Sequence, residues 1–117
     1  MSEKYNGWSN YETWAVALWL DNDAGTYEYV RELTHDTYDN ARAERYFTRE
    51  ERARLDLEDA LKEYIEENNP LANNASMYSD LLSAAISSVN WREIAGNYID
   101  ELDKSEWQGD EETEPAE

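Results

Sequence analysis

The chain contains no cysteine, which excludes disulfides and thiolate metal sites. Only four glycines and two prolines occur in 117 residues, and the glycines are too scattered for a phosphate-binding loop. The longest apolar run, residues 14–20, is far too short to span a bilayer. The start, MSEKYNGWSN, lacks the basic and apolar regions of a signal peptide, so we expect a cytoplasmic protein.

Basic residues are scarce relative to acidic ones. Ten lysines and arginines face 28 aspartates and glutamates, a net charge of −18. Such a charge repels nucleic acid and anionic membranes and attracts basic surfaces. A salt-rich cytoplasm favours the same composition because salt screens the repulsion, so a functional and an adaptive reading of the charge both remain open. Five tryptophans and nine tyrosines argue against disorder.

The most apolar segment is residues 8–23, WSNYETWAVALWLDND. Ser9 and Glu12 have the spacing of a capping box, which predicts a helix start there. A helix that is apolar nearly all round is usually buried, so we predict that this segment is the centre of the fold. Trp14 and Trp19 could form a stacking platform for a ligand, but the core is the favoured reading.

Four further helices follow from apolar spacing and cap signals. Gly25 is expected to end the first helix in a left-handed conformation. The second expected helix covers about residues 27–42 after a Thr26 cap, and the third covers about residues 49–68 after a Thr48–Glu51 capping box. A fourth helix, capped by Ser76 or Asn74, is expected to carry the apolar residues from Tyr78 to Val89, and a fifth, opened by a box-like Asn90–Glu93 pair, those from Trp91 to Leu102. No window alternates apolar and polar residues cleanly, so we expect no strands.

These signals predict an all-α fold of about five helices packed around a central N-terminal apolar helix. Residues 1–103 form the expected single helical domain. Residues 104–117 contain many acids, one lysine and little to bury apart from Trp107. This composition predicts an acidic, disordered C-terminal tail.

The stretch NGWSNYETWAVALWLDND resembles the opening of a family of small uncharacterised proteins of phages, plasmids and archaeal mobile elements. The resemblance covers about the first quarter of the chain and carries no activity or catalytic residues. It implies a mobile-element origin, where small acidic proteins often disable host defences. A phage-encoded protein of this kind would act in the host cytoplasm.

Catalytic and metal signals are weak. The single histidine, His35, stands beside Asp36, and we expect it to be a surface or half-buried helix residue rather than a catalytic base. Asp21, Asp23 and Glu32 have the outer spacing of a calcium loop, but the glycine needed at its sharp turn is absent. We therefore expect a protein that is not an enzyme and that has neither a metal site nor a cofactor.

Acidic residues form the remaining functional signal. Asp59, Glu63 and Glu67 repeat about every 6 Å along the expected third helix, a spacing similar in scale to that of DNA phosphates. The candidate partner-binding residues are Asp56, Glu58, Asp59, Glu63, Glu66, Glu67, Asp100, Glu101 and Asp103. A solvated helix face in a salty cytoplasm is an equally good reading of this pattern.

The favoured functional hypothesis is a nucleic-acid mimic that inhibits a restriction or CRISPR protein of the host. Its partner would be a basic nucleic-acid-binding protein, with no direct contact to nucleic acid or membrane, because arginines and lysines that bind phosphates also accept carboxylates. The alternative is an acidic helical interaction domain of a halophile or mobile element, whose charge is salt adaptation. A homodimer is left open, since no residue pattern identifies its patch.

Overall fold

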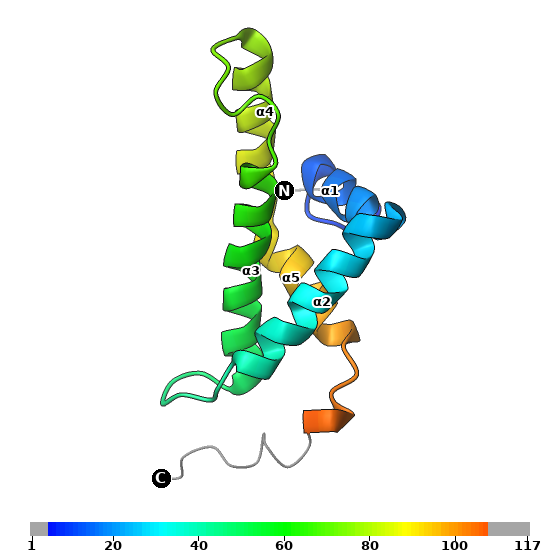
Figure 1. Cartoon of the computed structure of the whole chain (residues 1–117), viewed down its shortest axis with the longest axis vertical. Coiled ribbons are helices and arrows are strands. Elements are labelled where there is room, and N and C mark those ends of the chain that lie inside the picture. Colours follow the sequence, from blue (N-terminus) through cyan, green and yellow to red (C-terminus); the bar gives the residue numbers. More distant parts are fainter. Residues whose placement is uncertain (1–4, 108–117) are drawn as a thin grey trace.

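The computed structural model describes residues 5–107, and these confirm the all-α prediction (Figure 1). The helices are α1 (Tyr11–Asn22), α2 (Ala24–Asn40), α3 (Arg49–Glu67), α4 (Met77–Ser88), α5 (Trp91–Glu101) and the short 3₁₀ helix η1 (Ser105–Trp107). Within this part of the chain, extended pairing is limited to an isolated bridge between Tyr5 and Trp8. No helix among the described residues is both long and apolar enough to cross a membrane.

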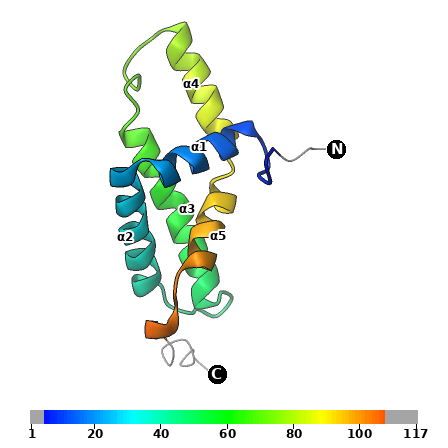
Figure 2. The ribbon, with the colours of Figure 1, turned by 90° about the vertical axis from the view of Figure 1, so that its right-hand side faces the viewer.

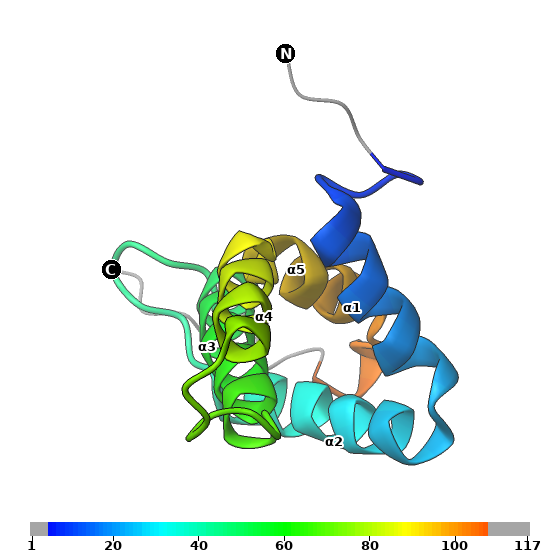
Figure 3. The same ribbon diagram turned by 90° about the horizontal axis from the view of Figure 1, so that it is seen from above.

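The centre of the fold is α5 rather than the predicted first helix. Figure 3 shows α5 between α3 and α1 with α2 along a third side, and α5 contacts all three helices. The buried residues of this 11-residue helix are Trp91, Ile94, Ala95, Gly96, Tyr98 and Ile99. Leu57 and Leu61 of α3 and Val30 of α2 are fully buried in the same core. The large hydrophobic side chains of α5 therefore hold the bundle together.

Helix α1 lies at the side of the bundle, although it is apolar nearly all round. Its buried residues are Thr13, Ala17 and Leu20, which follow the i, i+4, i+7 spacing of a single helical stripe. Trp19 is 71% exposed and Leu18 is 41% exposed. Two of the three buried side chains, Thr13 and Ala17, are small, whereas the larger Leu18 and Trp19 lie outside the contact.

Two predicted helix boundaries near α1 are wrong. The N-cap of α1 is Asn10, whose side chain accepts a hydrogen bond from the Thr13 backbone at 2.9 Å. Helix α2 begins three residues earlier than predicted, because Asp23 is its N-cap and accepts from both the nitrogen and the hydroxyl of Thr26. Gly25 therefore lies inside α2 instead of ending α1 with a positive φ.

The caps of α3, α4 and α5 agree better with the sequence. The Thr48–Glu51 capping box of α3 is complete, with both reciprocal hydrogen bonds present. Ser76 caps α4, and Asn90 caps α5 by accepting from the Glu93 backbone. Local spacing therefore located the starts of α3 and α5 correctly, and the structure decides between the two caps that the sequence offered for α4 in favour of Ser76.

The folded chain extends past the predicted boundary at Asp103. Trp107 is only 3% exposed, its ring centre lies 4.9 Å from that of Tyr38, and its indole nitrogen donates to Asp39 at 3.0 Å. Lys104 donates to the Ile99 carbonyl at 2.6 Å. These contacts attach η1 to α2 and the residue before it to α5. The rest of the predicted acidic tail, residues 108–117, lies outside the described residues.

Candidate functional site

The second half of α3 carries a group of carboxylates on the side opposite the core. These residues are Asp59, Glu63, Glu66 and Glu67, all exposed, and we call them the α3 acidic face. At about 100° per residue, the four fall within about 100° of the helix circumference. The core-facing Leu57 and Leu61 of the same helix are fully buried. Asp59 and Glu67 are separated by about 12 Å along the helix axis.

The α3 acidic face is not neutralised by the described part of the chain. None of its four carboxylates forms an ion pair with a residue between 5 and 107. Lys62, at the edge of the face, is also exposed and makes no such pair. The face therefore presents solvated negative charge that a basic surface could approach.

Two other predicted acids of α3 are paired with arginines. Asp56 lies 3.1 Å from Arg52 one turn earlier in the same helix. Glu58 lies 3.1 Å from Nε of Arg92, which comes from the start of α5. Because each charge is partly compensated, Asp56 and Glu58 contribute less negative potential than the α3 acidic face.

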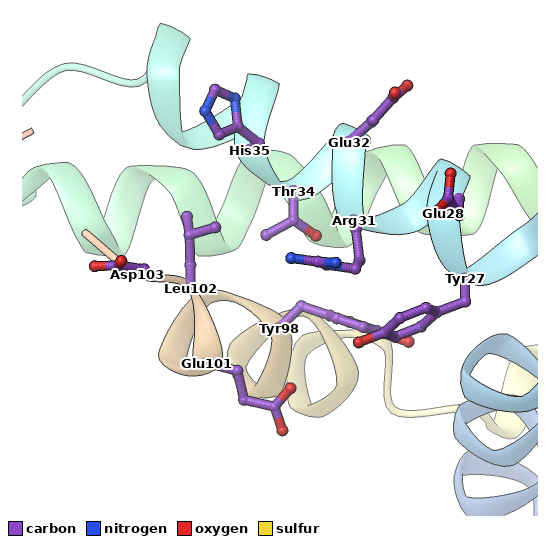
Figure 4. A pocket seen from close by; sticks show the side chains of 10 residues that line it. All are labelled: Tyr27, Glu28, Arg31, Glu32, Thr34, His35, Tyr98, Glu101, Leu102 and Asp103. Carbon is purple, nitrogen blue, oxygen red and sulfur yellow. The ribbon is translucent and has the colours of Figure 1, made fainter. Parts of the chain in front are cut away.

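The three predicted acids at the end of α5 do not join the α3 acidic face. Asp100 pairs with Arg54 near the start of α3. Glu101 and Asp103 border a pocket between α2 and α5 (Figure 4). Hydrogen bonds from the backbone and side chain of Ser105 hold the pKa of Asp103 below its usual value. Of the nine predicted acids, the structure therefore gathers four on one face and distributes five elsewhere.

The pocket has a volume of about 460 Å³. Its lining residues are Tyr27, Glu28, Arg31, Glu32, Thr34, His35, Tyr98, Glu101, Leu102 and Asp103. Figure 4 shows Arg31 extending between the two helices, close to Tyr98, and the Arg31 guanidinium carbon lies 5.7 Å from the centre of the Tyr27 ring. Sequence reasoning missed this pocket, because 67 residues separate Arg31 from Tyr98 and no local spacing links them.

Tyr98 joins the pocket to α1. Its hydroxyl donates to the Asp21 carboxylate at 2.6 Å. Burial, followed by this hydrogen bond and the negative charge of Asp21, raises the pKa of Tyr98 well above its usual value. The phenol therefore stays protonated at neutral pH and acts as a hydrogen-bond donor that positions α1 over α5.

His35 lies on α2 and borders the pocket. Its Nδ1 lies 3.6 Å from Asp36, and its ring centre lies 4.9 Å from that of Trp107. The neighbouring hydroxyl, that of Thr34, donates instead to the Val30 carbonyl at 2.8 Å. The expectation of a surface or half-buried helix residue agrees with a side chain that is 47% exposed.

The acids with calcium-loop spacing do not converge. Asp23 caps α2, and Asp21 accepts the Tyr98 hydroxyl. Glu32 lies further along α2 at the border of the pocket. Among residues 5–107, no group of three or more histidine or acidic side chains is placed to hold a metal ion.

The two tryptophans of α1 lie in different surroundings. Trp14 is partly buried and packs against Tyr5 and Tyr11, with ring centres 5.0 and 5.5 Å away. Trp19 is exposed, so the expectation that it belongs to the core is wrong. Neither ring stacks on the other to form the ligand platform considered from the sequence.

Comparison with known proteins gives a family but no activity. No curated protein and no solved structure matches the chain. A family model matches residues 1–108, a range that extends through the buried Trp107. The chain belongs to DUF7249, a family of unknown function.

Proposed function

We propose that the protein is a non-enzymatic acidic binding protein that imitates nucleic acid and occupies the basic groove of a host defence protein of the restriction or CRISPR type. The observation that supports this most strongly is the α3 acidic face, where four exposed carboxylates have no ion-pair partner among residues 5–107. The resemblance of the first quarter of the chain to mobile-element proteins supports the same class of partner.

The distribution of arginines strengthens this proposal. Arg52, Arg54 and Arg92 each pair with a carboxylate on α3 or α5. These pairs lie on the first half of α3 and at its contact with α5, whereas the second half of α3 keeps its charge. Negative potential is therefore concentrated on one part of the surface instead of being averaged over the helix.

Binding would be competitive with nucleic acid. Lysine and arginine side chains that contact phosphates form charge-assisted hydrogen bonds with carboxylates as well. Three carboxylates of the α3 acidic face, Asp59, Glu63 and Glu67, succeed one another at about 6 Å along the helix. A groove that normally follows a phosphate backbone could bind this row, and its nucleic acid would then be excluded.

The test is capture of a partner on the immobilised protein from lysate of a host cell, followed by elution first with duplex DNA and then with salt. A nucleic-acid-binding protein released by DNA is expected. The variant Asp59→Lys/Glu63→Lys/Glu67→Lys is expected to lose this partner while keeping its helical content, because the three side chains are exposed.

A matched control is available on α2. Glu28, Glu32 and Asp36 have the same i, i+4 spacing and are exposed, so changing all three to lysine alters the net charge equally. This control variant is expected to retain the partner. Equal loss of binding in both variants would show that total charge, rather than the α3 acidic face, is responsible. Unchanged binding of the α3 variant, or capture of no basic protein, would contradict the proposal.

A further inference from the structure

Helix α4 exposes large apolar side chains to solvent. Met77 is 64% exposed, Tyr78 is 69% exposed and Leu81 is 61% exposed. No residue of α4 is buried, and Figure 2 shows the helix projecting from one end of the molecule above α1. A stable monomer rarely leaves several neighbouring large hydrophobic residues uncovered, so this helix has the character of an interface.

The exposed residues are not those that attach α4 to the rest of the fold. Ile86 and the C-cap residue Val89 pack against the core. On the other side, four residues follow intervals of four, three and four along the helix, which places them on one line as in a coiled-coil seam. These residues are Met77, Leu81, Ala84 and Ser88, all exposed, and we call them the α4 outer seam.

Charge decides what can cover this seam. Residues 68–91 contain a single charged side chain, Asp80, in a protein whose net charge is −18. Two copies that met through the α3 acidic face would bring like charges together, whereas α4 and the loop before it add almost none. Surface that is nearly uncharged and apolar is where an acidic protein can approach another copy of itself.

We propose that a second copy of this chain docks on the α4 outer seam, with the two α4 helices antiparallel about a two-fold axis. The side-chain sizes along the seam are complementary in this orientation. Met77 and Leu81 are large and lie in the first half of the helix, whereas Ala84 and Ser88 are small and lie in the second half. Antiparallel pairing places Met77 opposite Ser88 and Leu81 opposite Ala84 of the second copy.

The parallel arrangement fits less well. It would place Met77 against Met77 and Leu81 against Leu81, while Ala84 and Ser88 would face their small counterparts across a gap. Antiparallel pairing fills the space evenly and aligns the helix dipoles favourably. It also gives an isologous interface, in which both copies use the same surface and the assembly closes as a dimer.

The interface is small, so the dimer is expected to be weak. Helix α4 has 12 residues and is therefore about 18 Å long. Contacts of this size belong to transient complexes, for which a dissociation constant in the micromolar range is typical. Because the two copies repel each other electrostatically, added salt is expected to strengthen dimerisation. Salt would weaken capture of a basic partner by the α3 acidic face. Dimerisation and partner capture therefore change in opposite directions with salt, and an experiment can contradict one proposal without contradicting the other.

The first experiment is sedimentation velocity over a concentration series from micromolar to about millimolar protein, at low and at 0.5 M sodium chloride. A monomer–dimer equilibrium that shifts toward dimer in salt is expected. Leu81→Glu is expected to weaken dimerisation at least about tenfold, because it places a charge in the middle of the seam. Ser83→Glu adds the same charge to the same helix at an exposed position about 130° around the helix from the seam, and this variant is expected to dimerise as the unmodified protein does.

Circular dichroism of both variants checks that α4 remains helical. A monomer at every concentration and salt level would overturn the proposal. Equal weakening by the two variants would overturn it as well, since charge on α4 rather than the outer seam would then control assembly.

Cysteine cross-linking tests the orientation independently, because the chain has no cysteine of its own. A mixture of Met77→Cys and Ser88→Cys proteins is expected to form a mixed disulfide under mild oxidation, since these positions face each other in the antiparallel dimer. Each variant alone is expected to cross-link poorly, because the two identical positions lie about 16 Å apart along the axis. Efficient cross-linking of Met77→Cys with itself would overturn the antiparallel arrangement.

Discussion

Glu93 Oε1 accepts hydrogen bonds from both the backbone nitrogen and the hydroxyl of Ser9, at 3.1 and 2.6 Å. The two residues are 84 positions apart and stand at the starts of α5 and α1. In return, the Asn90 backbone donates to Thr13 Oγ1 at 2.8 Å, and the Asn90 side chain donates to Ser9. The two helix starts thus satisfy each other's polar groups, and this network fixes α1 against α5.

Replacing Glu93 with alanine is expected to destabilise the fold by about 1–3 kcal/mol, because the partly buried donors of Ser9 would lose their charged acceptor. Glu12→Ala is the matched comparison and is expected to cost less than about 1 kcal/mol, the usual value of an acid in the first turn. Urea unfolding at neutral pH measures both. A larger loss for Glu12→Ala would mean that the Ser9–Glu12 capping box forms after all.

Tyr98 makes stability depend on alkaline pH. Its pKa is raised in the folded protein by burial and by Asp21, so the unfolded chain releases the phenolic proton first, near the ordinary value of about 10. Above that pH the unfolded state binds fewer protons than the native state. Stability from this group is therefore fully present below about pH 10 and decreases above it, by up to about 1.4 kcal/mol per pH unit.

Tyr98→Phe is expected to be less stable than the unmodified protein at pH 7 by about 1–2 kcal/mol, because the hydrogen bond to Asp21 is lost. The difference is expected to narrow above pH 10. Urea midpoints between pH 7 and 11.5 measure this change. Tyr46→Phe is the control for the loss of a tyrosine hydroxyl, and at pH 7 it is expected to cost less than about 0.5 kcal/mol because Tyr46 is 81% exposed. If the stability difference between Tyr98→Phe and the unmodified protein stayed constant from pH 7 to 11.5, the raised pKa of Tyr98 would be contradicted.

Trp107→Ala is expected to destabilise the protein by about 3–5 kcal/mol, the usual loss for a buried large aromatic residue. The indole packs on Tyr38 and donates to Asp39, so its removal leaves a cavity and an unpaired acceptor. Trp19→Ala removes an equally large side chain that is 71% exposed and is expected to cost less than about 1 kcal/mol. Thermal unfolding of the two variants measures both losses of stability. Equal losses would contradict the packing of η1 against the core.

Gly96 marks the close contact between α5 and α3. A Cβ atom built at this position would lie 2.7 Å from a guanidinium nitrogen of Arg54. Since that side chain is flexible and 36% exposed, it can move aside, and alanine has the better helix propensity by about 1 kcal/mol. Gly96→Ala is therefore expected to change stability by no more than about 1 kcal/mol. Gly96→Leu is expected to cost more than about 2 kcal/mol by forcing the helices apart, which urea unfolding would detect.

The positions of most helices follow from the sequence, because their signals are local. The Thr48–Glu51 capping box and the apolar stripe of α3 act within one or two helical turns, and the helix begins where they indicate. The end of α3 at Glu67 is equally local, because Pro70 follows three residues later and a proline disfavours a helical conformation in the residue before it. Near α1 the same reasoning failed, because Ser9 has a hydrogen-bond partner from α5 and Asp23 competes successfully with Thr26 for the start of α2.

Part of the candidate site also follows from local signals in the sequence, and part depends on how the helices pack. The α3 acidic face is readable from the sequence, since its carboxylates recur at intervals of one helical turn on one element. The sequence could not show that Glu58 is compensated by Arg92 or that Asp100 is compensated by Arg54, because these pairs join different helices. The pocket around Arg31 and Tyr98 also depends on the packing of α2 against α5.

The sequence by itself determined the all-α class, the helix starts with self-contained caps and the spacing of the acids on α3. The tertiary structure alone decided that α5 is central, that Trp107 belongs to the core and that α4 keeps its apolar side exposed. The reason is physical: propensity and capping act over three to four residues, whereas burial depends on which helices meet. An apolar residue such as Trp19 has the same local signal whether a neighbouring helix covers it or not.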